Sequence, residues 1–304
     1  MTLPNLVIAG APKCGTSSVY RWLADHPQAC ASRVKETFYL MDEGHPLQRK
    51  GTNFHTGGLE GYAAFFREQA NGCRVVFEAT THYIYQRTPV EVLSRLPAPP
   101  RVVFVLRKPS ERVYSSFQYS KNNLANVSGD LSFERFVALV KAGAGGAALG
   151  ELAGESAYVL GNDIRYSRYA EFIAPWVERF GRERVHVLLF EDLKSNPRAF
   201  MKGLAARLRI DPTFYDGYDF PLMNETFGVR YRALHRGARR LNALVPGGGL
   251  KAALRKAYVR AQSNGAATGR TPEDARALEE LEREFRPFNR RLADEFGLDL
   301  SAWE

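Results

Sequence analysis

Cysteine and long apolar stretches are both scarce in this sequence, and their scarcity limits the class of protein. Only three cysteines occur among 304 residues, at Cys14, Cys30 and Cys73, and no metal-ligand spacing links them. This excludes a disulfide-rich scaffold and a cysteine-based zinc site, and we expect three reduced thiols. No apolar run approaches the roughly 20 residues of a membrane-spanning helix. The chain also reaches an apolar stretch by Leu6 without a basic leader, so we expect a cytoplasmic protein with no transmembrane segment.

Acidic residues are absent from one long segment. Residues 226–272 contain no Asp or Glu but ten Lys or Arg, within a chain whose formal net charge is +9. Such a charge favours anionic partners, including nucleotides and sulfated or phosphorylated molecules. The segment is interpreted either as a solvated basic face or as a rim that attracts an anionic ligand, and the sequence leaves both open.

The order of apolar and amphipathic stretches predicts the fold. Apolar stretches predict strands at 6–9, 74–77 and 101–107 and a strand with a turn at 184–193, and amphipathic stretches predict helices at 17–25, 167–181, 196–210 and 272–297. Strands that alternate with helices favour an α/β fold with a mostly parallel central sheet flanked by helices. The glycine-rich stretches 141–150 and 245–251 are interpreted as loops and not as linkers, so we expect a single domain over residues 1–304.

The first predicted strand leads into a glycine-containing turn, GAPKCGTS, at 10–17. Gly10 and Gly15 let the backbone turn and approach a ligand closely, and the amides of the following helix can bind an anion. The two glycines have the spacing of a triphosphate-binding loop, yet Thr16 stands where that loop has its lysine. No aspartate suited to magnesium ends a later predicted strand. The turn therefore predicts phosphate binding and argues against an NTPase.

Two motifs resemble those of sulfotransferases that use 3′-phosphoadenosine 5′-phosphosulfate (PAPS). APKCGTSS (11–18) resembles their 5′-phosphosulfate loop, and VVFVLRKPSERVYSSF (102–117) resembles their 3′-phosphate-binding element. Further segments resemble heparan sulfate-type enzymes, namely 35–40, 77–85, 268–274 and 285–297. The resemblance implies an α/β domain related to P-loop nucleotide kinases. It also implies transfer of a sulfuryl group from PAPS to a hydroxyl or amine, with 3′-phosphoadenosine 5′-phosphate (PAP) as product and no metal.

The resemblance further implies which residues bind the donor. They are Lys13, Cys14, Gly15, Thr16, Ser17 and Ser18 at the phosphosulfate, Arg107 and Ser115 at the 3′-phosphate, and Gly269 and Arg270 in a late loop. Lys13 would also be catalytic, because its charge can stabilise the leaving phosphate. The residues alone leave other roles open: an ion pair for Arg107, a helix-surface hydroxyl for Ser115, and a charge preceding a helix for Arg270.

The acceptor must lose a proton when sulfur is attacked, and two residues could accept it. Glu36 matches the glutamate that serves as base in the resembled family, and its alternative role is an ion pair with Lys35 or Arg33. His82 is the rival, because a neutral histidine suits the task and other sulfotransferase branches use one.

The acceptor itself is poorly signalled by the sequence. Phe38 and Ala79 stand where heparan-type enzymes commonly have a histidine and a lysine. The resemblance therefore does not imply that this chain acts on a heparan-type acceptor. We expect a small metabolite, a glycolipid or another glycan as acceptor, and no nucleic acid. Two alternatives remain: a P-loop kinase or NTPase, and a non-catalytic protein that binds nucleotides or polyanions.

Overall fold

The chain folds into two compact units, and each is described by itself. The computed structural model describes residues 1–304 except 67–72, 125, 144–153, 222–226, 230–262 and 267–269. The first unit comprises residues 1–108, 168–223 and 285–304, and the second comprises 109–167 and 224–284. The expectation of a single domain over residues 1–304 stays a prediction.

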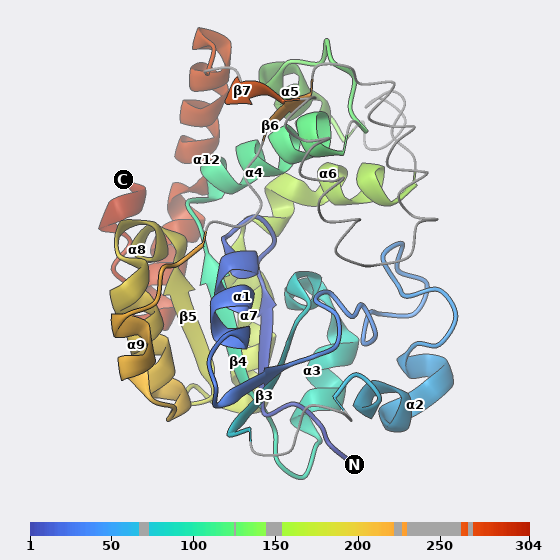
Figure 1. Cartoon of the computed structure of the whole chain (residues 1–304). Coiled ribbons are helices and arrows are strands. Elements are labelled where there is room, and N and C mark those ends of the chain that lie inside the picture. Colours follow the sequence, from blue (N-terminus) through green and yellow to red (C-terminus); the bar gives the residue numbers. More distant parts are fainter. Residues whose placement is uncertain (67–72, 125, 144–153, 222–226, 230–262, 267–269) are drawn as a thin grey trace. The chain divides into compact units, whose positions relative to one another are not determined.

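A five-stranded parallel sheet forms the centre of the first unit (Figure 1). Its strands are β1 (Leu6–Gly10), β2 (Ala29–Ala31), β3 (Val75–Ala79), β4 (Arg101–Leu106) and β5 (Val185–Leu189). Their spatial order is β2-β3-β1-β4-β5, and every neighbouring pair is parallel. All five residues of β1 are buried, which explains why this strand is apolar throughout and does not alternate. The predicted α/β fold with a parallel central sheet is confirmed.

Helices cover both faces of this sheet. α1 (Thr16–Ala24) contacts β1, β2 and β3 on one face, whereas α3 (Arg87–Ser94) and α7 (Tyr169–Phe180) pack against each other on the other face (Figure 1). The opposite placement of α1 and α3 follows from right-handed crossovers that run in opposite directions along the sheet, from β1 to β2 through α1 and from β3 to β4 through α3. Other helical segments of this unit are α2 (Phe54–Ala63), η1 (Thr81–Tyr85), α8 (Phe190–Ser195), α9 (Pro197–Leu208), η3 (Pro212–Asp216) and η4 (Ser301–Trp303).

The second unit is mainly helical. It contains α4 (Pro109–Gln118), the π-helical turn η2 (Tyr119–Asn123), α5 (Phe133–Lys141), α6 (Gly154–Tyr166) and an antiparallel pair of β6 (Phe227–Val229) and β7 (Ser263–Ala266). The long helix α12 (Pro272–Phe296) runs through Pro287 and contributes to both units. The Phe117 ring lies 5.0 Å from that of Phe136 and 5.6 Å from that of Phe133, so an aromatic cluster joins α4 to α5.

Some local predictions are wrong in detail. β2, α2, α3, α5 and α6 were not predicted, and the turn expected after β5 is the helix α8. Of the predicted glycine-rich loops, 144–150 and 245–251 lie outside the described residues. So do 230–262 and 267–269 of the basic segment.

The expectation of three reduced thiols is wrong for two of the cysteines. Cys30 and Cys73 form a disulfide, with their Cα atoms 5.9 Å apart. Cys30 lies on β2, which is paired with β3 in register, and Cys73 precedes the start of β3 by two residues. Strand pairing therefore brings together two residues that are 43 positions apart in the sequence. Cys14 stays a buried thiol.

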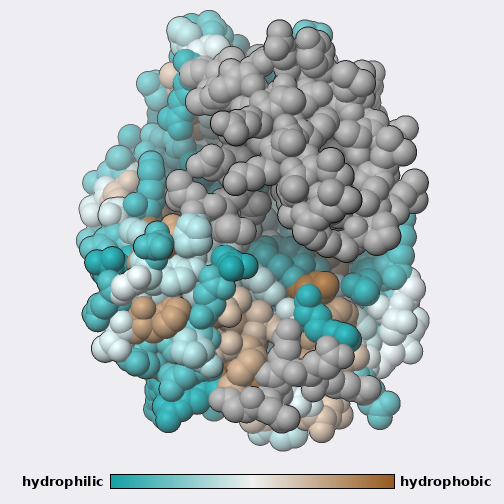
Figure 2. Space-filling model, viewed as in Figure 1, coloured by the Kyte–Doolittle hydropathy of each residue, from teal (hydrophilic) through white to brown (hydrophobic). Residues whose placement is uncertain are grey.

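In the coloured part of the face shown in Figure 2, most residues are hydrophilic and hydrophobic residues form small separate patches. Among the described residues, the exposed large hydrophobic side chains are Met1, Val34 and Tyr158. Within the same ranges, no helix is long and apolar enough to cross a membrane, and no group of three His, Cys, Asp or Glu side chains could hold a metal ion.

A buried ion pair joins α4 to α6 within the second unit. Arg112 Nη2 lies 3.1 Å from Asp163 Oδ1, and both side chains are only 1% exposed. Arg112 Nε also donates to Ser167 Oγ at 2.9 Å, and Nη2 donates to the Asp163 carbonyl. A charge removed from water in this way depends on its partner, because desolvation is costly for each ion alone.

We therefore expect Arg112→Met to lower the free energy of unfolding by about 3–5 kcal/mol, because it leaves the Asp163 carboxylate buried without its cation. Urea unfolding followed by circular dichroism measures this loss. The double variant Arg112→Met/Asp163→Leu should regain most of it. A loss below about 1 kcal/mol in the single variant would show that the pair behaves like an exposed one.

Candidate active site

The loop after β1 turns sharply into α1. Lys13 and Gly15 have left-handed backbone conformations, with φ of 69° and 79°. Thr16 then begins α1, and the Ser18 amide donates to the Gly15 carbonyl at 3.0 Å. The amides of this first turn lie at the positive end of the helix dipole, where an anion is stabilised. All the predicted phosphosulfate-binding residues, 13–18, belong to this turn.

Two glycines allow neighbouring segments to approach the loop closely. A Cβ atom on Gly10 would lie 2.8 Å from Cβ of Ile84, and one on Gly15 would lie 2.8 Å from Cδ2 of Phe190. Neither distance is possible without displacement of the neighbour. The glycines are thus required by packing, and Gly15 is required by its φ as well.

Arg107 follows β4 directly and lies close to the same loop. Its guanidinium is 4.9 Å from the centre of the Phe190 ring, the ring that also contacts Gly15. Its carbonyl accepts a hydrogen bond of 2.8 Å from the Tyr169 hydroxyl, which lies 3.9 Å from Cys14 Sγ. Phe190 and Tyr169 therefore connect the predicted phosphosulfate loop to the predicted 3′-phosphate arginine.

Glu36 is held at the carboxyl end of β3. Its amide donates to the Ala79 carbonyl at 2.9 Å, and the amide and hydroxyl of Thr81 donate to its carboxylate at 2.9 and 3.0 Å. Lys35 Nζ lies 2.5 Å from Oε1, and both side chains are 23% exposed. The ion pair considered for Glu36 is therefore present, and the carboxylate remains accessible. Since β3 and β1 are parallel neighbours, Glu36 lies at the same sheet edge as the loop after β1.

His82 lies next to the residue that binds Glu36. It follows Thr81 in η1, and its ring centre is 6.2 Å from that of Phe38 and 6.1 Å from that of Tyr85. The structure thus brings the two candidate bases to one region, with Phe38 beside His82.

Ser115 and Arg270 belong to the second unit. Arg270 Nη2 lies 2.7 Å from both carboxylate oxygens of Glu111, and its guanidinium lies 5.2 Å from the centre of the Tyr114 ring. Ser115 is half-buried on α4, one helical turn after Glu111. Arg270 therefore lies against the part of α4 that carries Ser115. Gly269 lies outside the described residues.

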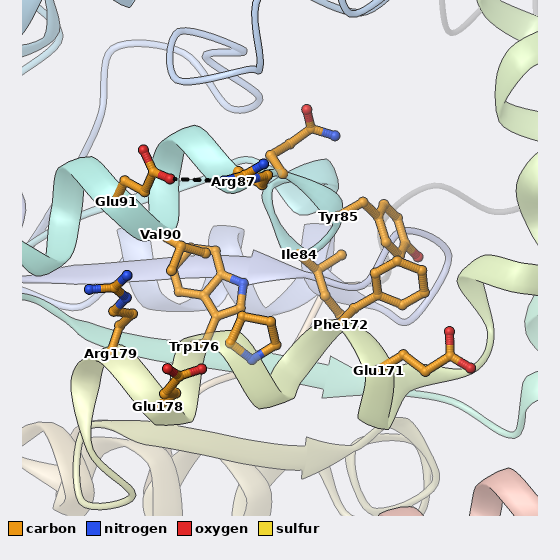
Figure 3. A pocket seen from close by; sticks show the side chains of 12 residues that line it. Ile84, Tyr85, Arg87, Val90, Glu91, Glu171, Phe172, Trp176, Glu178 and Arg179 are labelled. Carbon is orange, nitrogen blue, oxygen red and sulfur yellow. Dashed lines mark ion pairs between the residues drawn. The ribbon is translucent and has the colours of Figure 1, made fainter.

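A groove of about 290 Å³ lies between η1, α3 and α7 (Figure 3). Ile84, Phe172 and Trp176 line it, and Arg87 and Glu91 form an ion pair of 3.6 Å at its rim. None of the predicted site residues line the groove. We therefore locate the candidate site at the carboxyl edge of the sheet, where the loop after β1, Arg107 and Glu36 are found, and not in the groove.

Sequence reasoning missed Phe190 and Tyr169. Phe190 begins α8 directly after β5, and Tyr169 begins α7. A signal for Phe190 was present, because a residue at the end of a parallel strand faces the ligand-binding edge. Tyr169 has no such signal, since the residues it contacts are distant in the sequence.

Comparisons with known proteins agree with these features. A family model for the sulfotransferase domain matches residues 3–213. The bifunctional heparan sulfate N-deacetylase/N-sulfotransferase of Drosophila melanogaster is 24% identical over 230 residues, which cover 69% of this chain and 20% of that protein. Bifunctional heparan sulfate N-deacetylase/N-sulfotransferase 1 of Caenorhabditis elegans is 24% identical over 218 residues, covering 71% and 23%. The chain thus spans about a fifth to a quarter of the length of these relatives.

A solved structure supports the same fold. The crystal structure of a sulfotransferase from Alicyclobacillus acidocaldarius superposes with a TM-score of 0.65 at 21% identity, covering 100% of this chain and 99% of the other. The family model spans well over half of the sequence, from the loop after β1 through Glu36 and Arg107 to β5. The predicted resemblance is thereby confirmed, and the chain belongs to the sulfotransferase domain family.

Proposed function

We propose that this chain transfers a sulfuryl group from PAPS to a hydroxyl or amine of a small metabolite, a glycolipid or another glycan. The main support for the proposal is that a turn suited to anion binding, 13–18, lies close to Arg107. Phe190 and Tyr169 each contact both the turn and Arg107. A donor with phosphate groups at its 5′ and 3′ positions needs two such cationic or amide-rich sites at a fixed separation.

In the proposed reaction the acceptor oxygen or nitrogen attacks sulfur. The bond between sulfur and the bridging oxygen breaks, and PAP leaves with the electron pair. Lys13 and the first-turn amides of α1 would stabilise the charge that develops on the leaving phosphate. Arg107 would bind the 3′-phosphate through paired charge-assisted hydrogen bonds. Ser115, Gly269 and Arg270 stay predictions for the same nucleotide.

We assign the role of base to Glu36. Its carboxylate is fixed by two hydrogen bonds from Thr81 and is still partly exposed, so it is both oriented and reachable. The proton of the acceptor would pass to Glu36 as the new bond to sulfur forms. His82, which follows Thr81, is the competing base.

The acceptor would differ from that of the heparan sulfate relatives. Phe38, with its ring beside His82, makes this part of the site aromatic where those enzymes commonly have a histidine. We further propose that residues 1–304 form one sulfotransferase domain, which is supported by a family model that includes residues of both units. A cytoplasmic location stays a prediction of the sequence.

The donor assignment predicts a preference for PAP over AMP. Arg107→Ala should weaken PAP binding about 10- to 100-fold, the equivalent of about 1.5–3 kcal/mol for charge-assisted hydrogen bonds, and should leave AMP binding unchanged. Isothermal titration calorimetry measures both affinities. Arg101→Ala, at the other end of β4, is the matched control. Equal affinity of the unmodified protein for PAP and AMP would contradict the assignment.

The base assignment predicts a difference between two variants. Glu36→Gln should lower kcat by about 10²–10⁴-fold, whereas His82→Asn should change it by less than about 10-fold. Turnover is measured with labelled PAPS and an acceptor found by screening a library of metabolites and glycans. PAP binding by both variants serves as the control for folding. Near-normal turnover of Glu36→Gln, with loss in His82→Asn, would assign the base to His82 instead.

A further inference from the structure

Glu78 is a buried acid that the proposed chemistry does not use. It is the fourth residue of β3, and its exposed fraction is 0%. Hydroxyl groups bind its carboxylate: Thr37 and Thr80 donate to Oε2 at 2.8 and 2.7 Å, and Tyr62 donates to Oε1. Burial raises the pKa of Glu78 above its ordinary value, the three hydroxyl donors oppose this rise, and the negative charge of Glu36 adds to it. A buried acid held in this way needs a structural or functional reason.

The hydrogen bonds around Glu78 have a defined direction. A carboxylate only accepts, so the hydroxyl protons of Thr37 and Thr80 both point toward it. Thr80 Oγ1 can then accept the Thr37 amide at 2.9 Å, and Thr37 Oγ1 can accept the Tyr83 hydroxyl at 2.9 Å. Tyr83 in turn accepts the Leu40 amide at 3.0 Å. From Glu78, hydrogen bonds therefore lead to the backbone of residues 37–40.

That backbone is strained at the two positions that flank Thr37. Glu36 and Phe38 have φ of 59° and 50°, the left-handed region that residues with a Cβ atom rarely adopt. A left-handed conformation is unfavourable for a residue with a Cβ atom, and it persists only where surrounding contacts hold it. Thr37 is fully buried, and both its amide and its hydroxyl are bound. Bonds at Thr37 therefore offset the strain on both of its neighbours.

We propose that Glu78 is a positioning residue for the base. Its carboxylate orders Thr37 and Thr80, these hold the backbone at Glu36 in its left-handed conformation, and the Glu36 carboxylate then meets Thr81 at the edge of the sheet. The inference rests on the proposed function, because it assigns a role relative to Glu36 as base. The residues that bind the Glu78 carboxylate, Thr37, Thr80 and Tyr62, are not among the residues predicted to bind the donor, so its proposed role is separate from donor binding.

Thr37→Val tests whether hydrogen bonds link Glu78 to the backbone at Glu36, because it removes the Thr37 hydroxyl with little change in side-chain volume. We expect kcat to fall about 10²-fold, the loss that a displacement of about 1 Å can cause. PAP affinity should stay unchanged, since the loop after β1 is not part of the network. Thr37→Ser, which restores the hydroxyl, should recover most of the turnover. Glu78→Met should lower kcat to the same extent. If Glu78→Met no longer binds PAP, the variant is not folded correctly, and the result for Thr37→Val decides.

Tyr62→Phe is the matched control. It removes the hydrogen bond to Oε1 of the same carboxylate, whereas Thr37 and Thr80 bind Oε2, and it keeps the ring that stacks on Tyr39. We expect turnover close to that of the unmodified protein. A loss in Tyr62→Phe as large as that in Thr37→Val would overturn the proposal, because it would assign the effect to general stability.

A double variant separates this inference from the proposed function. In the Glu36→Gln background, Thr37→Val should cause no further fall in kcat, since both changes act through one group. A second fall of about 10²-fold would overturn the positioning role. The positioning role would also be overturned if Thr37→Val had normal turnover while Glu36→Gln was inactive. Normal turnover of Glu36→Gln itself would contradict the base assignment instead.

Discussion

Parallel pairing is the constraint on which the site depends. Because β3, β1, β4 and β5 are parallel neighbours, the chain leaves all of them at the same edge of the sheet. The segments that follow these strands are the η1 turn, the loop predicted to bind phosphate, Arg107 and Phe190. Residues as far apart in the sequence as Gly15 and Phe190 thus meet at one edge of the sheet. Antiparallel strands would have divided the same residues between two edges.

The candidate site also concentrates backbone strain. Five described residues with a Cβ atom have a positive φ, and three of them, Lys13, Glu36 and Phe38, belong to segments at this edge; the other two are Arg209 and Phe220. Strained residues of this kind are maintained only where nearby contacts hold them. At Glu36 and Phe38 the contacts are hydrogen bonds that begin at a buried carboxylate. The same buried contacts that contribute to the stability of the fold thus fix the backbone at Glu36, the proposed base.

The sequence permits a prediction where one segment carries the whole signal. The loop with Gly10 and Thr16 is a local pattern, and Arg107 comes directly after a valine-rich strand, so both could be predicted. The disulfide between Cys30 and Cys73 could not be, because it depends on the pairing of β2 with β3. Phe190 was missed for a related reason, since its contact with Gly15 exists only after β5 has joined the sheet. The hydrogen bonds of Glu78 likewise join three separate segments, and no periodicity in the sequence reports them.

The contact between Gly10 and Ile84 has a consequence for motion. A Cβ atom on Gly10 would lie 2.8 Å from Cβ of Ile84 and 3.0 and 3.2 Å from its Cγ2 and Cδ1, so the Gly10 backbone packs directly against the Ile84 side chain. A shift of the loop after β1 must then displace η1, the segment that carries His82 and the amide bound to Glu36. The proposed donor loop and the segment next to the proposed base are therefore coupled through this packing contact.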